Sequence, residues 1–294
     1  MSMRGTTDRP STVLGRQLGD ELRRYREAAG LSTTQAAEAL DCTKGKISRM
    51  ENGRVLVRTP DVVALLHAYG VDEPETRERL TRLTRTANRR RREGWWHQYG
   101  SVLADTYRDY VEMESICESV RIFQAQLIPG LLQTAEYARA VTVASRAWQS
   151  SEEIDQFVQV RIARQQRLVN ESPLELWAVL AQGVLHQQVG GNEVMHAQLR
   201  HVIAMAEQPN ITVQVLPFSR GAHSGMFGPY LLMSFPQVTA QDLVLTETPT
   251  GNIWMERESE VAHYRTLFDD ARTASLPPTE SLTLIRRIAE ELQP

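Results

Sequence analysis

Apolar residues recur three and four positions apart along the first third of the chain, which is the period of an amphipathic helix. Leu18, Leu22 and Tyr25 follow this spacing and predict a first helix that ends at Gly30. The same spacing predicts four further helices, and Thr59 is expected to be the N-cap of the fourth helix of the five. The five helices are predicted at about residues 17–29, at two short stretches within 33–53, at 59–70 and at 74–92, with Val62, Val63, Leu65, Leu66 and Tyr69 of the fourth and Leu80, Leu83 and Ala87 of the fifth facing the core.

The break between the two short helices has its own local signals. Ser32 is expected to cap the first of them, with Gln35 three residues on to complete a capping box. Asp41 lies where the chain must turn, and Asp is one of the few residues that tolerate left-handed backbone angles. Thr43 is then expected to cap the second helix. This pattern is typical of a helix-turn-helix.

The second half of the chain has a different pattern. A helical period begins at about Tyr107 and continues through Met113 to Val120 and Phe123. After Pro173, short apolar runs bounded by Pro, Gly or Asn predict strands. The strands are predicted at 174–180, 211–216, 230–235, 243–246 and 253–255, and helices at 154–169, 192–207, 259–275 and 278–292. The chain is therefore expected to combine an N-terminal all-α five-helix domain with a C-terminal α+β domain, whose mixed or antiparallel sheet is flanked by helices.

The second short helix carries the candidate site. Ile47 and Met50 fall on one side of it, whereas basic and hydroxyl side chains lie off that stripe. Arg and Lys can donate to guanine O6 and N7 in the DNA major groove, and Ser can bond base edges or phosphates. The alternative is a solvated helix face without a ligand. The candidate DNA-binding residues are Thr33, Thr43, Lys44, Lys46, Ser48, Arg49, Asn52 and Arg54.

A family resemblance extends over the whole motif, carried by Gly30-Leu31-Ser32, Ala37, Leu40, Ile47-Ser48-Arg49 and Glu51-Asn52-Gly53. Through these residues, positions 17–72 resemble the XRE or lambda-repressor-like family of transcriptional regulators. That family commonly has a phosphate-binding Gln where this chain has Thr33, and a Gly where it has Asp41. Gly45 stands where many relatives read a base. The resemblance therefore implies that the basic and hydroxyl side chains around Gly45 supply specificity.

Charge is divided unevenly along the chain. The whole protein has a net charge of −3, but residues 1–95 carry 19 Lys and Arg against 13 Asp and Glu, whereas residues 96–294 carry 14 against 23. An excess of basic residues around the helix-turn-helix is expected for a domain that binds the phosphate backbone of DNA. The run Arg89–Arg92 is either a further DNA contact or a solvated helix end whose cations offset the helix dipole.

A second resemblance is carried by five separated motifs that occur in the family's order: Pro129-Gly-Leu-Leu-Gln-Thr134 with Tyr137-Ala138, Arg161-Ile-Ala-Arg164, Val189-Gly-Gly191, Asn210-Ile-Thr-Val-Gln-Val-Leu-Pro217 and Gly221-Ala-His223. Residues 105–292 resemble the regulatory domain fused to XRE modules in actinobacterial antitoxin-like regulators, the group that includes WhiJ-type developmental regulators. The resemblance implies a small, neighbour-encoded acidic or toxin-like protein as a partner.

Catalytic and metal-binding candidates are weak. His196 and His201 are five residues apart on one predicted helix, off the spacing of four that would place two ligands on one face. Gly221-Ala-His-Ser-Gly225 puts a His beside a Ser in a loop, but a nucleophile also needs a base geometry that the sequence does not show. The sequence has no phosphate-binding loop, dinucleotide fingerprint or nucleophile elbow. We expect no enzyme, no cofactor and no metal.

The sequence shows no recognisable sorting signal, which bears on the cellular compartment of the protein. No run of about 18 apolar residues occurs, and the N-terminus lacks the apolar segment of a signal peptide. Cys42 and Cys117 fit a reducing compartment, and Cys42 is expected to face the core. We therefore expect a cytoplasmic protein that does not enter a membrane.

Together these patterns indicate a sequence-specific transcriptional regulator that binds a double-stranded DNA operator as a homodimer. The expected organisation is a DNA-binding domain at 13–92, a linker at 93–106 and a regulatory domain at 107–292 that senses a small protein partner or a ligand. Two alternatives remain open. The chain could be an antitoxin-like protein that sequesters a small toxin-like partner and binds DNA for autoregulation, or a small-molecule sensor with a pocket near the 221–225 loop.

Overall fold

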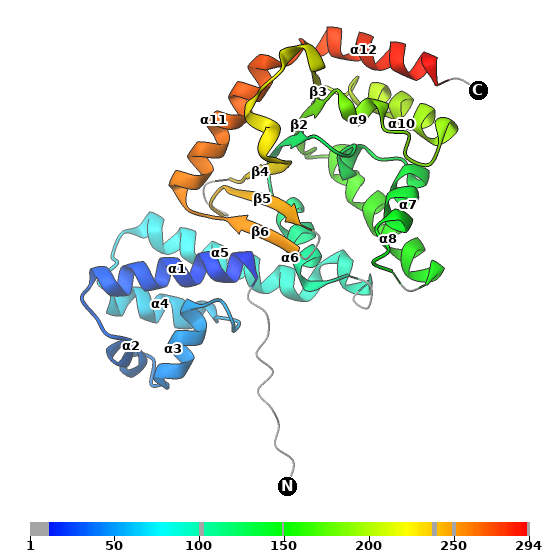
Figure 1. The fold of residues 1–294 in the computed structure, drawn as a ribbon. Helices are drawn as coiled ribbons and strands as arrows, with labels where there is room; N and C mark the ends of the chain where they lie inside the picture. Colours follow the sequence, from blue (N-terminus) through cyan, green and yellow to red (C-terminus); the bar gives the residue numbers. More distant parts are fainter. Residues whose placement is uncertain (1–11, 100–102, 149, 237–239, 249–250, 293–294) are drawn as a thin grey trace. The chain divides into compact units, whose positions relative to one another are not determined.

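The computed structural model describes residues 12–99, 103–148, 150–236, 240–248 and 251–292, except for the side chains of 90–93 and 97 (Figure 1). The chain forms two compact units. Unit 1 comprises Met1–His97 and Pro236–Gln241, and unit 2 comprises Gln98–Phe235 and Asp242–Pro294.

Unit 1 contains the five predicted helices, which are α1 (Val13–Ala28), α2 (Thr33–Ala39), α3 (Lys44–Glu51), α4 (Thr59–Ala68) and α5 (Pro74–Glu93). Their apolar faces form one core, in which Leu14, Leu22 and Ile47 are fully buried. The first helix begins four residues earlier than predicted. The Gly15 amide donates to Thr12 Oγ1 over 3.2 Å, so Thr12 caps the helix at a position that the apolar spacing does not mark.

Three predictions about unit 1 need correction. The N-cap of α4 is Arg58, and Thr59 is already helical. Val63 is 39% exposed, because the buried face of α4 passes through positions 62, 65, 66 and 69, and residue 63 lies about 100° away from position 62. Cys42 is only half-buried, since it lies in the turn rather than on a packed helix face.

Unit 2 is built on a six-stranded mixed sheet, so the predicted α+β architecture is confirmed. The strands are β1 (Ser119–Gln124), β2 (Glu175–Ala181), β3 (Ile211–Leu216), β4 (Tyr230–Ser234), β5 (Leu243–Thr248) and β6 (Gly251–Met255), in the order β3-β2-β1-β4-β5-β6. The pairs β1–β2 and β2–β3 are parallel, whereas β1–β4, β4–β5 and β5–β6 are antiparallel. β1 therefore joins a parallel half of the sheet to an antiparallel meander.

β1 was not predicted, because its apolar residues match the spacing of a helix. The predicted helix through Val120 and Phe123 is wrong, because α6 (Asp105–Glu114) ends before them and both residues lie in β1. Val120 and Phe123 are buried, but on a strand they point to opposite faces. A spacing of three thus matched a helix by coincidence, since both faces of a central strand are covered.

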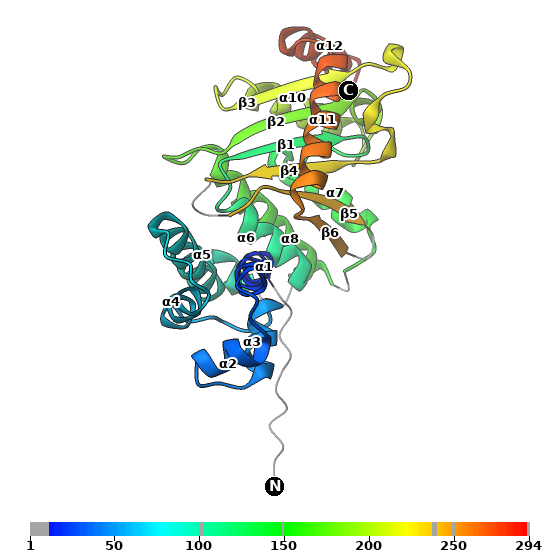
Figure 2. The ribbon, with the colours of Figure 1, turned by 90° about the vertical axis from the view of Figure 1, so that its left-hand side faces the viewer.

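Helices cover both faces of the sheet. α11 (Glu258–Ala274) crosses one face, where Phe268 packs in a cluster with Phe123, Val179 and Leu232 (Figure 2). α6 and α8 (Ser151–Arg164) lie on the opposite face (Figure 2). The remaining elements of unit 2 are α7 (Ala135–Ala144), α9 (Gly183–His186), α10 (Asn192–Met205), α12 (Pro278–Glu291) and the 3-10 turns η2 (Gly130–Leu132), η3 (Gln165–Leu168), η4 (Phe218–Arg220) and η5 (Ser224–Phe227). A further 3-10 turn, η1 (Trp95–Tyr99), follows α5.

In the described parts of the chain, no helix combines the length and apolar character needed to cross a membrane.

Candidate DNA-binding surface

The turn between α2 and α3 forms through the predicted local contacts. The backbone N–H of Gln35 donates to Ser32 Oγ over 3.3 Å, and the backbone N–H of Ser32 donates to Gln35 Oε1 over 2.9 Å. Together these two bonds complete the capping box. Asp41 has a positive φ of 46°, and the Lys46 amide donates to Thr43 Oγ1 over 3.3 Å. Ser32, Asp41 and Thr43 therefore have the cap and turn positions predicted for them, and the two helices form a helix-turn-helix.

A buried ion pair fixes α3 against α1. Arg26 Nε donates to Glu51 Oε1 over 2.6 Å, and Arg26 Nη2 donates to Glu51 Oε2 over 3.0 Å. The two side chains are 9% and 5% exposed. The hydrogen bond that Arg26 donates to Glu51 is the main reason that the pKa of Arg26 is raised. Arg26 Nη1 also donates to the Leu31 carbonyl over 2.8 Å, so one guanidinium connects α1, the start of the turn region and the end of α3.

The same two helices approach each other backbone to backbone. A Cβ added to Gly19 would lie 2.5 Å from the Glu51 carbonyl oxygen. One turn earlier on α1, a Cβ on Gly15 would lie 3.1 Å from the Gly53 carbonyl oxygen. Gly53 itself has a φ of +65°, which favours glycine. The sequence reasoning missed this contact, although two glycines spaced four apart on the first helix could have indicated it.

The exposed face of α3 is a stripe of residues 44, 45, 48, 49 and 52, here called the α3 stripe. Ile47, Met50 and Glu51 are buried on the other side. Lys44, Ser48 and Arg49 are exposed, so three of the predicted residues come together on one face. A Cβ on Gly45 would meet Arg49 Nη1 at 3.4 Å, which shows that the Arg49 guanidinium lies beside Gly45.

Lys46 is set apart from this stripe. Its ammonium group lies 3.0 Å from Asp61 Oδ2, and Arg58 Nη2 donates to Asp61 Oδ1 over 2.8 Å. Burial alone would raise the pKa of the Asp61 carboxyl, but the hydrogen bonds and charges of Arg58 and Lys46 outweigh burial and lower that pKa. Lys46 is thus held by a carboxylate of α4 and would have to exchange this partner to bind DNA.

The other predicted residues lie around the stripe. Asn52 Nδ2 donates to the Ser48 carbonyl over 2.6 Å, while Asn52 Oδ1 accepts from Arg23 Nη2 over 3.1 Å, so the Asn52 amide is already engaged within the protein. Thr33 is half-buried at the start of α2, whereas Thr43 and Arg54 are exposed at the two ends of α3.

The prediction about the run Arg89–Arg92 falls partly outside the described residues. Arg89 is exposed near the end of α5, but the side chains of Arg90, Arg91 and Arg92 are outside the described residues. A DNA contact by this run stays a prediction.

Three of the histidine and serine candidates of unit 2, His196, His223 and Ser224, have local structural partners, whereas His201 Nε2 is buried without a hydrogen-bond partner among the described residues. His196 Nδ1 lies 2.8 Å from the Ala289 carbonyl oxygen. His223 Nδ1 accepts from the Gly225 amide over 3.1 Å, while Ser224 Oγ donates to the Leu267 carbonyl over 3.0 Å. His223 and Ser224 therefore do not pair as base and nucleophile. Within the described residues, no group of three or more His, Cys, Asp or Glu side chains is placed to hold a metal ion.

Comparison with known proteins divides the chain in the same two parts. A helix-turn-helix domain family matches residues 17–80. A second family, described as a domain of unknown function (DUF5753), matches residues 107–287. No curated protein and no solved structure matches the chain.

Proposed function

The chain belongs to the family of the domain of unknown function DUF5753, and with a helix-turn-helix domain ahead of that domain, we propose that it is a sequence-specific transcriptional regulator of the XRE type. The observation that carries the proposal is the α3 stripe. Its cationic side chains are exposed, and the helix that bears them is fixed from behind by the Arg26–Glu51 ion pair. A rigid helix with exposed donors is what base reading in a major groove requires.

We assign different roles to the side chains on and around α3. Lys44, Ser48 and Arg49 would contact base edges, with Arg49 suited to guanine O6 and N7. Thr33, Thr43 and Arg54 flank the helix and would bind phosphates, which position the protein without reading sequence. Asn52 would act by holding the end of α3 through Ser48 and Arg23.

The proposal extends to assembly and regulation. Because one recognition helix contacts few bases, useful selectivity needs two half-sites, and we propose that residues 107–292 support a homodimer in the cytoplasm. The same region would sense a small neighbour-encoded protein or a ligand. Its excess of acidic residues, 23 against 14 basic residues over 96–294, suits contact with something other than DNA. Molar mass in solution tests the dimer, since a monomer at the concentration that saturates an operator would contradict it.

Selection of bound sequences from a random DNA library tests the reading role. The full chain should enrich one operator, and Arg49→Ala should weaken binding to it by about 1–3 kcal/mol while relaxing preference at one base pair. Arg82→Ala is the matched control, because Arg82 is an exposed cation of unit 1 that pairs with Glu78 on α5, outside the α3 stripe. An unchanged preference in Arg49→Ala would refute the assignment of the reading face.

A second candidate function is an antitoxin-like protein that sequesters a small toxin-like partner and binds DNA for autoregulation. It is favoured by large apolar side chains that unit 2 exposes in the loop between β3 and β4. Phe218 is 66% exposed, Met226 67% and Phe227 98%. Exposed apolar side chains that gather in one segment are typical of protein-binding surfaces.

Binding of the purified neighbour-encoded small protein distinguishes this candidate. Phe227→Ser should abolish complex formation, whereas Val143→Ser, at a 54% exposed apolar position on α7, should leave it intact. If both variants bind as the wild type does, the 218–227 loop is not the partner surface.

A further inference from the structure

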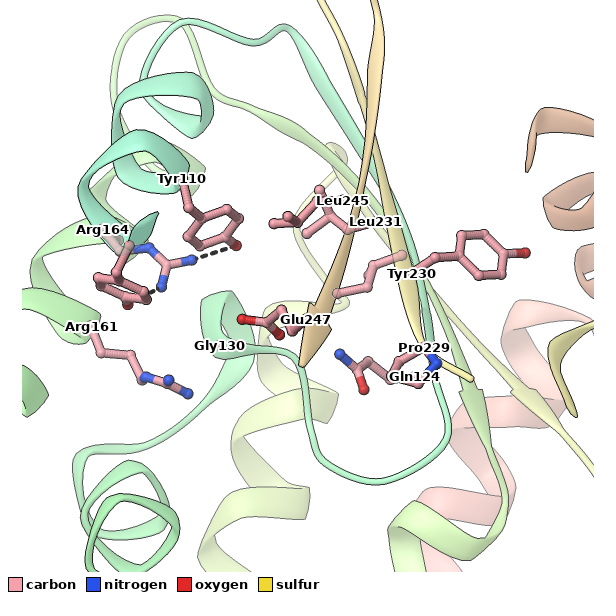
Figure 3. A pocket seen from close by; sticks show the side chains of 12 residues that line it. Tyr110, Gln124, Gly130, Arg161, Arg164, Pro229, Tyr230, Leu231, Leu245 and Glu247 are labelled. Carbon is pink, nitrogen blue, oxygen red and sulfur yellow. Dashed lines mark hydrogen bonds between the residues drawn. The ribbon is translucent and has the colours of Figure 1, made fainter. Parts of the chain in front are cut away.

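Unit 2 contains a cavity of about 40 Å³ on the sheet face opposite α11 (Figure 3). Its floor is formed by β1, β4 and β5, and its walls by α6, α8 and the turn at Gly130. At roughly 10–15 Å³ for one water, this space holds about three waters or the carboxylate end of a small ligand. The cavity is partly open to solvent, and Glu247 in its lining is exposed, so the rest of a small ligand can extend out of the enclosed space.

One wall of the cavity is a buried ion pair whose two charges balance each other. Arg164 Nε and Nη2 donate to the two carboxylate oxygens of Glu114 over 2.7 and 2.6 Å, and both side chains are buried. Arg164 also donates to the hydroxyl groups of Tyr107 and Tyr110 over 2.5 and 2.6 Å. The Arg164 charge is therefore balanced within the protein, and the cluster forms a fixed polar wall.

A second guanidinium on the same helix, that of Arg161, lies over the Phe157 ring at 5.2 Å from its centroid and makes no ion pair among the described residues. Arg161 Nη1 donates to Gln133 Oε1 over 2.7 Å, which orients the side chain toward the cavity rim. Arg161 Nε is buried and has no hydrogen-bond partner among the described residues. An unsatisfied buried donor is costly, so this nitrogen favours an acceptor from outside the protein.

Gly130 keeps the space between the two guanidinium groups open. A Cβ at this position would lie 3.6 Å from Nη1 of Arg161 and 3.6 Å from Nη1 of Arg164. These are ordinary contacts, and Gly130 is not among the glycines with a positive φ, so alanine would fit here but would occupy part of the cavity.

The opposite side of the cavity offers an anion and an amide. The Glu247 carboxylate on β5 and the Gln124 amide on β1 line it, and neither side chain makes a hydrogen bond or an ion pair within the described part of the chain. Figure 3 shows Arg161, Glu247 and Gln124 around the same space. The cavity thus has a cation and an anion on different walls, both available to a ligand.

We propose that this cavity binds a small zwitterion of the α-amino acid type, with its carboxylate on Arg161 and its ammonium group on Glu247. Charge-assisted hydrogen bonds to both ends would be stronger than neutral ones. A plain anion would satisfy Arg161 but would lie near Glu247, and a plain cation would have the reverse difficulty. This zwitterion would be the ligand that the regulatory domain senses. Its effect on DNA binding rests on the proposed function, whereas its binding to the cavity does not.

Calorimetry on the full chain with glycine, L-alanine, acetate and methylammonium tests the binding itself. Glycine or L-alanine should bind saturably, and acetate and methylammonium should bind at least about tenfold more weakly, which corresponds to 1.4 kcal/mol. No saturable binding of either amino acid would overturn the proposal, as would acetate binding as tightly as glycine, because the site would then be a simple anion site.

Variants of the cavity locate the site. Arg161→Gln, Glu247→Gln and Gly130→Ala should each weaken binding about tenfold or more. Arg139→Gln is the matched control, because Arg139 is an exposed cation on α7 that pairs with Asp155. Equal affinity in all four variants would overturn the location. Operator affinity with and without the amino acid is a separate measurement, which tests regulation and leaves the binding result unaffected.

Discussion

Arg26 on α1 and Glu51 at the end of α3 form a two-point ion pair, with both side chains less than a tenth exposed. The pair lies directly behind the exposed face of α3. It couples the stability of unit 1 to the orientation of the helix that is proposed to read DNA.

Loss of this pair should therefore lower stability and DNA binding together. Among the described residues, Arg26→Ala leaves Arg23 as the cation nearest to the buried Glu51 carboxylate, with its Nε 3.6 Å away. We expect a loss of about 3 kcal/mol in the free energy of unfolding. Urea unfolding of the full chain measures the change. Arg82→Ala, at a surface pair, should cost less than about 1 kcal/mol, and a comparable loss in both variants would contradict the structural role of Arg26.

Two glycines of unit 1 should respond to alanine in opposite directions. Gly19→Ala would place a Cβ 2.5 Å from the Glu51 carbonyl oxygen, so α1 and α3 must separate, at a cost of about 1–3 kcal/mol. In Gly45→Ala the added Cβ would meet Arg49 Nη1 at 3.4 Å and Thr43 Oγ1 at 3.9 Å, which are ordinary contacts, and the change should stabilise α3 by about 0.5–1 kcal/mol. Melting temperatures of the two variants, measured side by side, decide the matter. A stable Gly19→Ala protein would show that the helices are not held at this distance.

Asp61 should make stability depend on pH in the acid range. Its pKa is lowered in the folded protein, so its contribution to stability is present above the unfolded value of about 3.9 and is lost as pH falls through the lower folded pKa. Asp61→Asn should therefore be less stable than the wild type at neutral pH, and the difference should shrink below about pH 4. Urea unfolding at several pH values tests this. A difference that stays constant down to pH 3 would mean that the ionised carboxylate contributes nothing.

Arg54 should act on affinity without affecting sequence preference. It is exposed just beyond α3, and a phosphate contact there would release a counterion when DNA binds. Arg54→Ala should weaken binding to all sequences alike and reduce the slope of log affinity against log salt by about 1. Fluorescence anisotropy over a salt series measures the slope. A change in preferred bases instead would move Arg54 into the reading face.

The helix-turn-helix could be predicted nearly to the residue because its signals are local. Ser32 and Thr43 each accept from a backbone amide three residues on, and Asp41 itself adopts the left-handed backbone angle of the turn, so each signal and its effect lie within one short stretch. Helical spacing alone predicted that Lys44, Ser48 and Arg49 share an exposed face, although it also placed Lys46 there. The buried side chains Ile47 and Met50 fix which way the exposed residues point.

Contacts between distant segments could not be predicted in this way. Arg26 and Glu51 are 25 residues apart, and either could have been a surface charge. The partner of Lys46, Asp61, lies on another helix, so a residue assigned to base reading proved to be held within the protein. In unit 2, β1 was missed because a strand covered on both faces has no alternation, and its apolar residues matched a helical spacing as well.

The position of β1 in the sheet determines how much of unit 2 can fold while the chain is still being synthesised. β1 can pair with β2 as soon as both have left the ribosome, but its other neighbour is β4, where Ser119 pairs with Ser234. Until β4 emerges, one edge of β1 has unpaired backbone groups. α11, which covers Phe123 and Val179, is made later still. Chains with open strand edges and bare apolar faces aggregate readily, so we expect truncations that end before residue 230 to be insoluble.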